Sequence, residues 1–183
     1  MDRGMSPPNQ ALAHEFLAFS RAKLLEEYWP RLRTCVAALT DEQIWWSPND
    51  ASNSVGNLLL HLNGNVRQWL ITSFNVADDR RDRPAEFAAS GSIPVATLLQ
   101  QLDTTLQEAE AVLAGLGEAD LLRRMDIQGY TVTGTHAVYH VVEHFSMHYG
   151  QIVYITKLLT GANLGFYGEL DATGKKPRDS FQR

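Results

Sequence analysis

The sequence predicts an all-α protein: a four-helix bundle with a long loop between its second and third helices and a small hairpin before the fourth. Apolar residues recur at helical spacing along four segments, near residues 9–39, 55–71, 94–116 and 133–160. Hydrophobic residues make up 44% of the chain and charged residues 20%, the balance of an ordinary globular protein. Because 183 residues suit one core, we expect a single domain over residues 1–183.

The first helical segment follows a proline-containing stretch, residues 1–8, which we interpret as a loose leader. Its apolar side chains recur every three to five residues, at Leu12, Phe16, Phe19, Leu24, Tyr28, Leu32, Val36 and Leu39. Pro30 lies inside this run, so the helix either kinks there or divides in two. Thr40 and Gln43 then form a capping box that begins a short helical turn.

A polar segment, residues 75–92, separates the second helix from the third and is longer than an antiparallel connection requires. We expect it to fold over one end of the bundle. Its arginines, Arg80, Arg81 and Arg83, are interpreted as a solvated charge cluster, with contact to an anionic substrate as the alternative.

The third helix is predicted to begin at Pro94 and to face inward through Leu98, Leu102, Leu106, Ala109 and Leu113. A short helical turn, 118–122, precedes alternating residues around Gln128-Gly129, which indicate a hairpin. The fourth helix is capped by Thr133 or Thr135 and ends before Gly161. Residues 168–183 are predicted as a polar tail.

The fourth helix contains four histidines at a four-residue step: His136, His140, His144 and His148. Each step rotates the side chain by roughly 40°, so one metal ion can take two successive imidazoles but not all four. The spacing leaves open which two. No acid lies between His144 and His148, and Glu143 points roughly 100° away, so a zinc-peptidase site would lack its general base. The alternative is that the row only lines a polar seam.

His61 follows three leucines in the second helix, so we expect it to be buried, where its ring nitrogens need partners. Asn57 and Asn65 share its stripe, and Gly64 leaves room for a close approach to the backbone. A lone core histidine is more often hydrogen-bonded than metal-bound, so a metal role for His61 depends on the fourth helix. Three neutral imidazoles would suit a divalent ion such as Zn²⁺ or Ni²⁺ and leave an open coordination position, as in catalytic sites.

Two stretches, Ser54–His61 continuing to Trp69, and His140–Ile152, resemble the DinB/YfiT-like metal-binding four-helix bundles. The resemblance extends from the first helix to about residue 167 and implies an up-down-down-up bundle. It implies metal ligands at His61, His144 and His148. His140 would line the pocket or serve as an alternative ligand, and His136 is excluded. Asn57, Asn65 and Gln151 would orient a ligand or hold the imidazoles.

Members of that superfamily include S-transferases that use low-molecular-weight thiols, a thiol-dependent maleylpyruvate isomerase and proteins described as metal-dependent hydrolases. The resemblance therefore implies a metal-dependent enzyme that activates a thiol or water toward a small-molecule substrate, with no catalytic residue assigned. The alternative is a non-catalytic metal-binding or stress-related module.

Composition narrows the remaining function classes. A net charge of −5 argues against a nucleic-acid binder, and the single cysteine, Cys35, excludes an internal disulfide. The sequence contains no apolar run of bilayer length and does not begin like a signal peptide, so we expect a cytoplasmic protein without a membrane partner. Apolar helix faces left over after bundle packing lead us to expect a homodimer.

Overall fold

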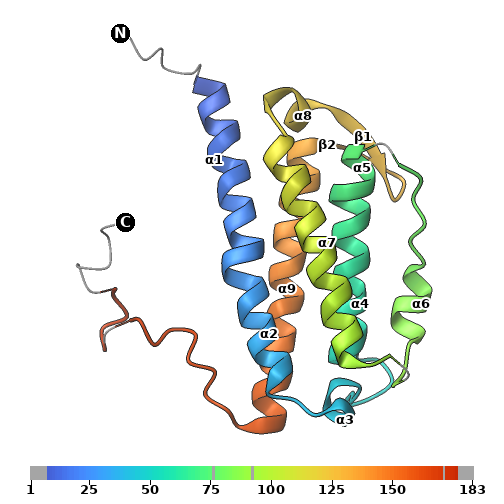
Figure 1. Cartoon of the computed structure of the whole chain (residues 1–183), viewed down its shortest axis with the longest axis vertical. Helices are drawn as coiled ribbons and strands as arrows, with labels where there is room; N and C mark the ends of the chain where they lie inside the picture. Colours follow the sequence, from blue (N-terminus) through green and yellow to red (C-terminus); the bar gives the residue numbers. More distant parts are fainter. Residues whose placement is uncertain (1–7, 76, 92, 171, 177–183) are drawn as a thin grey trace.

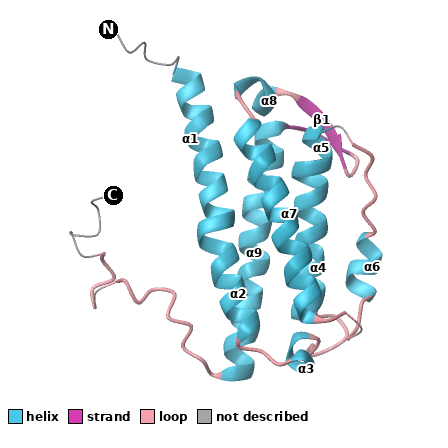
Figure 2. Cartoon of the chain, in the orientation of Figure 1, coloured by secondary structure: helices cyan, strands magenta, loops and turns pink. Residues whose placement is uncertain are grey.

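The computed structural model describes residues 8–75, 77–91, 93–170 and 172–176 of the chain. Within these ranges it is a helical bundle with one small hairpin (Figures 1 and 2). The first two long segments each consist of two α-helices joined by a π-helical stretch: α1 Pro8–Ala22, η1 Lys23–Tyr28 and α2 Trp29–Ala37, then α4 Val55–Val66, η2 Arg67–Thr72 and α5 Ser73–Asn75. The other two are single helices, α7 Val95–Gly115 and α9 Gly134–Thr160.

The directions of the four segments explain the long loop. The first segment and α9 run one way, whereas α4 and α7 run the other, so the bundle has the expected up-down-down-up arrangement (Figure 1). Because α4 and α7 are parallel and adjacent, the chain must return along the full length of α4 between them. The return segment contains the short helix α6 Arg83–Ala88, which packs against α4. Our expectation that this segment folds over one end of the bundle was wrong.

The first segment divides into two α-helices, one of the two alternatives predicted at Pro30, with the π-helical stretch η1 between them. Pro30 lies in the first turn of α2 and has no N–H to bond the carbonyl one turn earlier. The π-helical stretch ends at Tyr28, two residues before Pro30. In η2 the hydroxyl of Ser73 donates to the carbonyl of Gln68, five residues earlier, at 2.7 Å.

The core confirms most of the predicted apolar stripes. All five residues predicted to face inward on α7 are buried: Leu98, Leu102, Leu106, Ala109 and Leu113. Two predictions on the first helix were wrong, because Leu12 and Phe19 are 71% and 61% exposed. Ala13 and Leu17 occupy the inward positions of α1 instead. The apolar stripe of α1 is therefore wider than the face the bundle can cover.

Short elements connect the bundle as predicted. Thr40 and Gln43 form the capping box of α3 Asp41–Ile44. After α8 Glu118–Leu122, the antiparallel strands β1 Arg124–Ile127 and β2 Tyr130–Thr133 form the hairpin. Its turn residues, Gln128 and Gly129, have φ of 52° and 82°, as a two-residue turn of the I′ type requires.

The ends of α9 also follow the sequence. Thr133 caps its start by accepting a hydrogen bond from the backbone of His136, and Gly161 ends it in the left-handed conformation at φ 65°. Residues 1–7 of the predicted leader and residues 171 and 177–183 of the predicted tail lie outside the described part of the chain.

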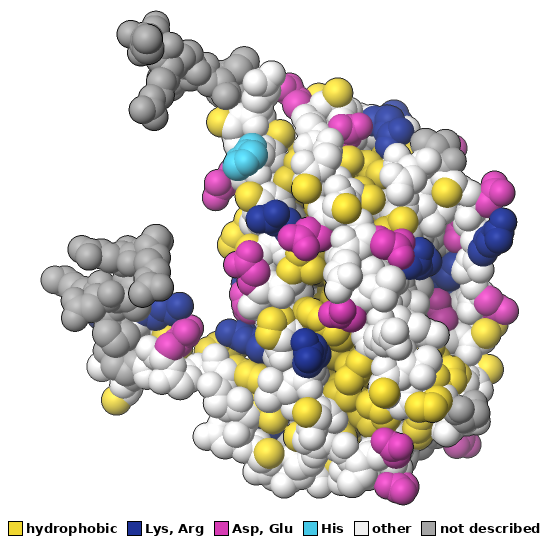
Figure 3. Space-filling view, in the orientation of Figure 1, with side chains coloured by type: hydrophobic (Ala, Val, Ile, Leu, Met, Phe, Trp, Pro, Cys, Tyr) yellow, Lys and Arg dark blue, Asp and Glu magenta, His cyan; other side chains and the backbone are white. Residues whose placement is uncertain are grey.

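Charged side chains alternate in sign over the surface seen in Figure 3. Lys and Arg lie among Asp and Glu there, so no continuous basic area forms on that face. Among the described residues, none of the helices combines the length and apolar composition that a bilayer-spanning segment needs.

Candidate metal centre

Three imidazoles from two helices converge between α4 and α9. Nε2 of His144 lies 3.2 Å from Nε2 of His61 and 3.3 Å from Nε2 of His148. One ligand atom from each of the three rings lies within 4.8 Å of the other two. Tetrahedral bonds of about 2.05 Å to one ion would separate nitrogen ligands by about 3.3 Å. The observed spacing of the two contacts therefore matches what a shared ion requires.

The neighbours of two rings fix where their protons lie. Nδ1 of His61 lies 2.8 Å from Oε2 of Glu86 and 3.1 Å from Nη2 of Arg81. The carboxylate contact is the shorter one, and Nη2 of Arg81 already donates to the same oxygen of Glu86, so we assign a proton to Nδ1 of His61, which donates it to the carboxylate. Nδ1 of His148 likewise faces Oε1 of Gln151 at 2.7 Å. In the neutral ring, a proton on Nδ1 leaves a lone pair on Nε2. The Nε2 atoms of His61 and His148 therefore both present lone pairs to His144.

His144 cannot satisfy both neighbours by hydrogen bonding. Its Nε2 carries at most one proton and can donate to only one of the two lone pairs. Its buried Nδ1 has no hydrogen-bond partner among the described residues. A buried polar cluster with surplus acceptors is costly unless something positive occupies it. The donor set thus suits a cation held by three nitrogens.

Burial keeps the rings of His144 and His148 neutral. Desolvation, aided by the neighbouring imidazoles, lowers the pKa of His144 to about 3. Burial also lowers the pKa of His148, although the hydrogen bond to Gln151 opposes this. Neutral imidazole is the form that binds metal, so His144 and His148 need not lose a proton at neutral pH before an ion enters.

Sequence reasoning missed the ion pair behind His61. The guanidinium of Arg81 holds Glu86 through two bonds, Nε to Oε1 at 2.7 Å and Nη2 to Oε2 at 2.9 Å, and both side chains are almost fully buried. Burial raises the pKa of Glu86, but the hydrogen bonds from His61 and Arg81 lower it by more, so the carboxylate is ionised. The interpretation of Arg81 as part of a solvated cluster was wrong.

Gly64 is the one sequence signal that pointed to this ion pair. A Cβ on Gly64 would lie 2.0 Å from Oε1 of Glu86 and 2.8 Å from Nε of Arg81. The glycine therefore leaves the space that the ion pair fills, one turn after His61.

Three other predicted site residues, Asn57, Asn65 and His140, contact residues that surround the three rings. Asn65 contacts Nε2 of His140 at 3.1 Å, and the His140 ring packs on Trp69 with centroids 4.0 Å apart. His140 also lies beside His144, at 5.1 Å between ring centroids, but is not part of the triad. Asn57 donates to the carbonyls of Glu86 and Ala89 at 3.0 and 2.8 Å, so it fastens α6 to α4.

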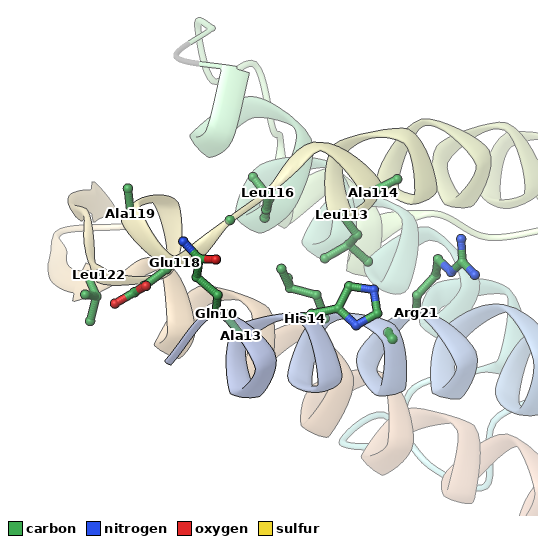
Figure 4. A pocket seen from close by; sticks show the side chains of 13 residues that line it. Gln10, Ala13, His14, Arg21, Leu113, Ala114, Leu116, Glu118, Ala119 and Leu122 are labelled. Atoms are coloured by element: carbon green, nitrogen blue, oxygen red, sulfur yellow. The ribbon is translucent and has the colours of Figure 1, made fainter. Parts of the chain in front are cut away.

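Two histidines lie apart from this cluster. His136 is exposed at the start of α9, as expected for a residue excluded from the site. His14 lies at a cavity of about 880 Å³ formed by α1, the end of α7 and α8 (Figure 4). The lining of that cavity includes Leu17, Leu113 and Arg21 but none of the triad.

The up-down-down-up bundle with a hairpin before its last helix is a DinB-like fold. Within it, the three-histidine cluster between α4 and α9 is a candidate metal centre of this chain. A DinB-like protein from Bacillus cereus superimposes with a TM-score of 0.61 at 13% identity, over 79% of this chain and 93% of that one. The DinB-like protein YjoA from Bacillus subtilis gives 0.59 at 15% identity, over 81% and 94%. A conserved protein from Enterococcus faecalis gives 0.62 at 19% identity, over 83% and 97%.

Within this fold the chain belongs to a named family. Residues 11–167 match the model of DUF1572, described as a protein of unknown function, and the chain is a member of that family. No curated protein sequence matches the chain.

Proposed function

We propose that this protein binds a divalent transition-metal ion, Zn²⁺ or Ni²⁺, through His61, His144 and His148, and uses it to activate a thiol or water for reaction with a small molecule. The observation that carries the proposal is the meeting of three Nε2 atoms, two of which have lone pairs fixed by Glu86 and Gln151. Imidazole nitrogen is a preferred ligand of both ions.

The chain's own residues prepare the site in three ways. Burial keeps His144 and His148 neutral, Glu86 and Gln151 orient His61 and His148, and the ion pair with Arg81 fixes Glu86. When bound, an ion with three neutral ligands and an open position lowers the pKa of a thiol or water ligand toward neutral. The reaction class is conjugation of a low-molecular-weight thiol to a small electrophile, or hydrolysis.

Metal content tests the first half of the proposal. The wild type, His144→Ala and His136→Ala are purified without chelator from cells grown with ample zinc and nickel, and analysed by mass spectrometry of the elements. We expect one ion per chain in the wild type and in His136→Ala, the exposed control on the same helix, and almost none in His144→Ala. Equal, near-zero content in all three would refute metal binding.

Activity assays test the second half. The metal-loaded protein is offered several electrophiles with several bacterial thiols, and in parallel a panel of hydrolysable esters and amides. Turnover that disappears in the metal-depleted protein and in His144→Ala supports an enzyme.

A non-catalytic role is favoured by one observation, the burial of His61 and His148, which are 4% and 8% exposed. A closed site of this kind would use the ion to join α4 to α9. In that case the metal raises the unfolding temperature while every activity assay stays at background.

A further inference from the structure

The outward face of α9 carries large apolar side chains that no other described part of the chain covers. Tyr139, Met147, Tyr154 and Leu158 are 62%, 48%, 69% and 58% exposed. Their separations of eight, seven and four residues bring all four onto one side of the helix, within roughly 100°. An apolar face of this length on a surface helix is typical of a site covered by another molecule.

Gly150 lies in the middle of this face. It is exposed, and a Cβ built on it would meet nothing within 4 Å, so packing inside the chain does not require glycine there. Glycine within a helix costs about 0.5–1 kcal/mol relative to alanine. A glycine that no internal contact explains permits another backbone to approach closely from outside.

The charges on α9 are arranged symmetrically about Gly150. Glu143 and Lys157 are the only Asp, Glu, Lys or Arg residues in the helix, and each lies seven residues from the glycine. Both are exposed, and neither forms an ion pair with the other described residues.

We propose that this face binds the same face of a second copy, with the two α9 helices antiparallel and crossing at Gly150. Under that two-fold symmetry, Glu143 meets Lys157 of the partner subunit, and the reverse pair forms across the axis. Met147 meets Tyr154 of the partner subunit, a sulfur–aromatic contact. A parallel arrangement would instead place like charges together, so the sequence selects the antiparallel one.

The surface beside the helix has room for the partner's side chains. A cavity of about 580 Å³ is bounded by Met147, Tyr154 and Leu158 from α9 and by Trp46 from the connection between α3 and α4. Side chains reaching over Gly150 from a second copy enter the region of this cavity, which extends the apolar contact beyond the two helices.

Charge reversal tests the register. Sedimentation velocity is run on the full-length chain over micromolar to submillimolar concentrations, for the wild type, Glu143→Lys, Lys157→Glu and the double reversal. We expect the wild type to dimerise and each single reversal to raise the dissociation constant about tenfold, because two ion pairs become two repulsive pairs. The double reversal restores the wild-type constant, and an equimolar mixture of the two single variants forms a heterodimer.

Gly150→Gln tests the close approach independently of charge. Glutamine improves the helix propensity at this position, so the monomer's unfolding temperature stays level or rises. The dimer dissociates nonetheless, because the new side chain occupies the crossing point. Glu15→Lys, on the exposed side of α1, is the matched control and leaves the dimer intact.

Three results would overturn the proposal. One is a wild type that remains monomeric throughout the concentration range. The second is a dimer that dissociates with Glu15→Lys but not with Gly150→Gln. The third is a double reversal that stays as weak as the single variants.

Discussion

Glu86→Gln isolates the role of the carboxylate behind His61. Glutamine keeps the shape of the side chain and can still accept a hydrogen bond, but it removes the charge that fixes the proton on Nδ1 of His61. Groups that orient a metal-binding histidine typically contribute 10–100-fold to affinity, so we expect the variant to bind Zn²⁺ or Ni²⁺ about 10–100-fold more weakly. That range corresponds to about 1.4–2.8 kcal/mol.

The same substitution also destabilises the metal-free protein. Arg81 loses its charged partner while its side chain remains 5% exposed, and breaking such a buried pair costs about 3–5 kcal/mol. The double variant Arg81→Gln/Glu86→Gln removes both charges, so it should recover much of that stability without recovering the metal affinity. The two effects can therefore be measured separately.

The assay pairs a metal titration against a chromophoric chelator with urea unfolding of the metal-free protein. Glu108→Gln is the control, since Glu108 forms an exposed ion pair with Arg67 and its loss should cost less than about 1 kcal/mol. If Glu86→Gln binds metal as tightly as the wild type while His144→Ala binds none, then Glu86 does not orient His61 and our reading of the tautomers is wrong.

Three further predictions concern the stability of the protein: its dependence on pH, on the space at Gly64 and on a bound metal ion. The metal-free protein should lose stability as the pH falls below about 6.5, because burial lowers the pKa values of His140, His144 and His148 only in the folded state. His144, whose pKa is lowered to about 3, should contribute a loss of at most about 1.4 kcal/mol per pH unit down to that pH. Urea midpoints that do not change between pH 7.5 and 5.5 would contradict this. Gly64→Ala should destabilise the protein by about 1–3 kcal/mol although alanine has the better helix propensity, because the new Cβ would overlap Glu86. In the same urea assay Gly115→Ala should stabilise the protein, because a Cβ at that position meets no described atom within 4 Å. A metal ion at 100 times its dissociation constant should stabilise the wild type by about 2.7 kcal/mol, a rise of about 5–11 °C in calorimetry that His144→Ala should lack.

The elements that local rules govern were predicted well. Thr133 and Gly161 bound α9 because a side-chain cap and a left-handed glycine act within one turn of the helix. Gln128-Gly129 forms the hairpin turn because two adjacent residues with positive φ are needed there. The inward stripe of α7 follows from its spacing alone.

Features that depend on packing between segments were harder to predict. The stripe on α1 included Leu12 and Phe19 because apolar spacing does not show how wide a face the neighbouring helices cover. The convergence of His61, His144 and His148 required both the i, i+4 pair and the resemblance, since nothing near His61 identifies its partners. Glu86 lies 25 residues from His61, and no local pattern connects them.

Long separation along the chain also constrains when the centre can form. His61 and His144 are 83 residues apart, and they meet only after α9 has packed beside α4. A chain made only as far as α7 contains one imidazole of the three, because His144 and His148 both belong to α9. The metal loading that we propose would therefore follow the packing of α9 beside α4.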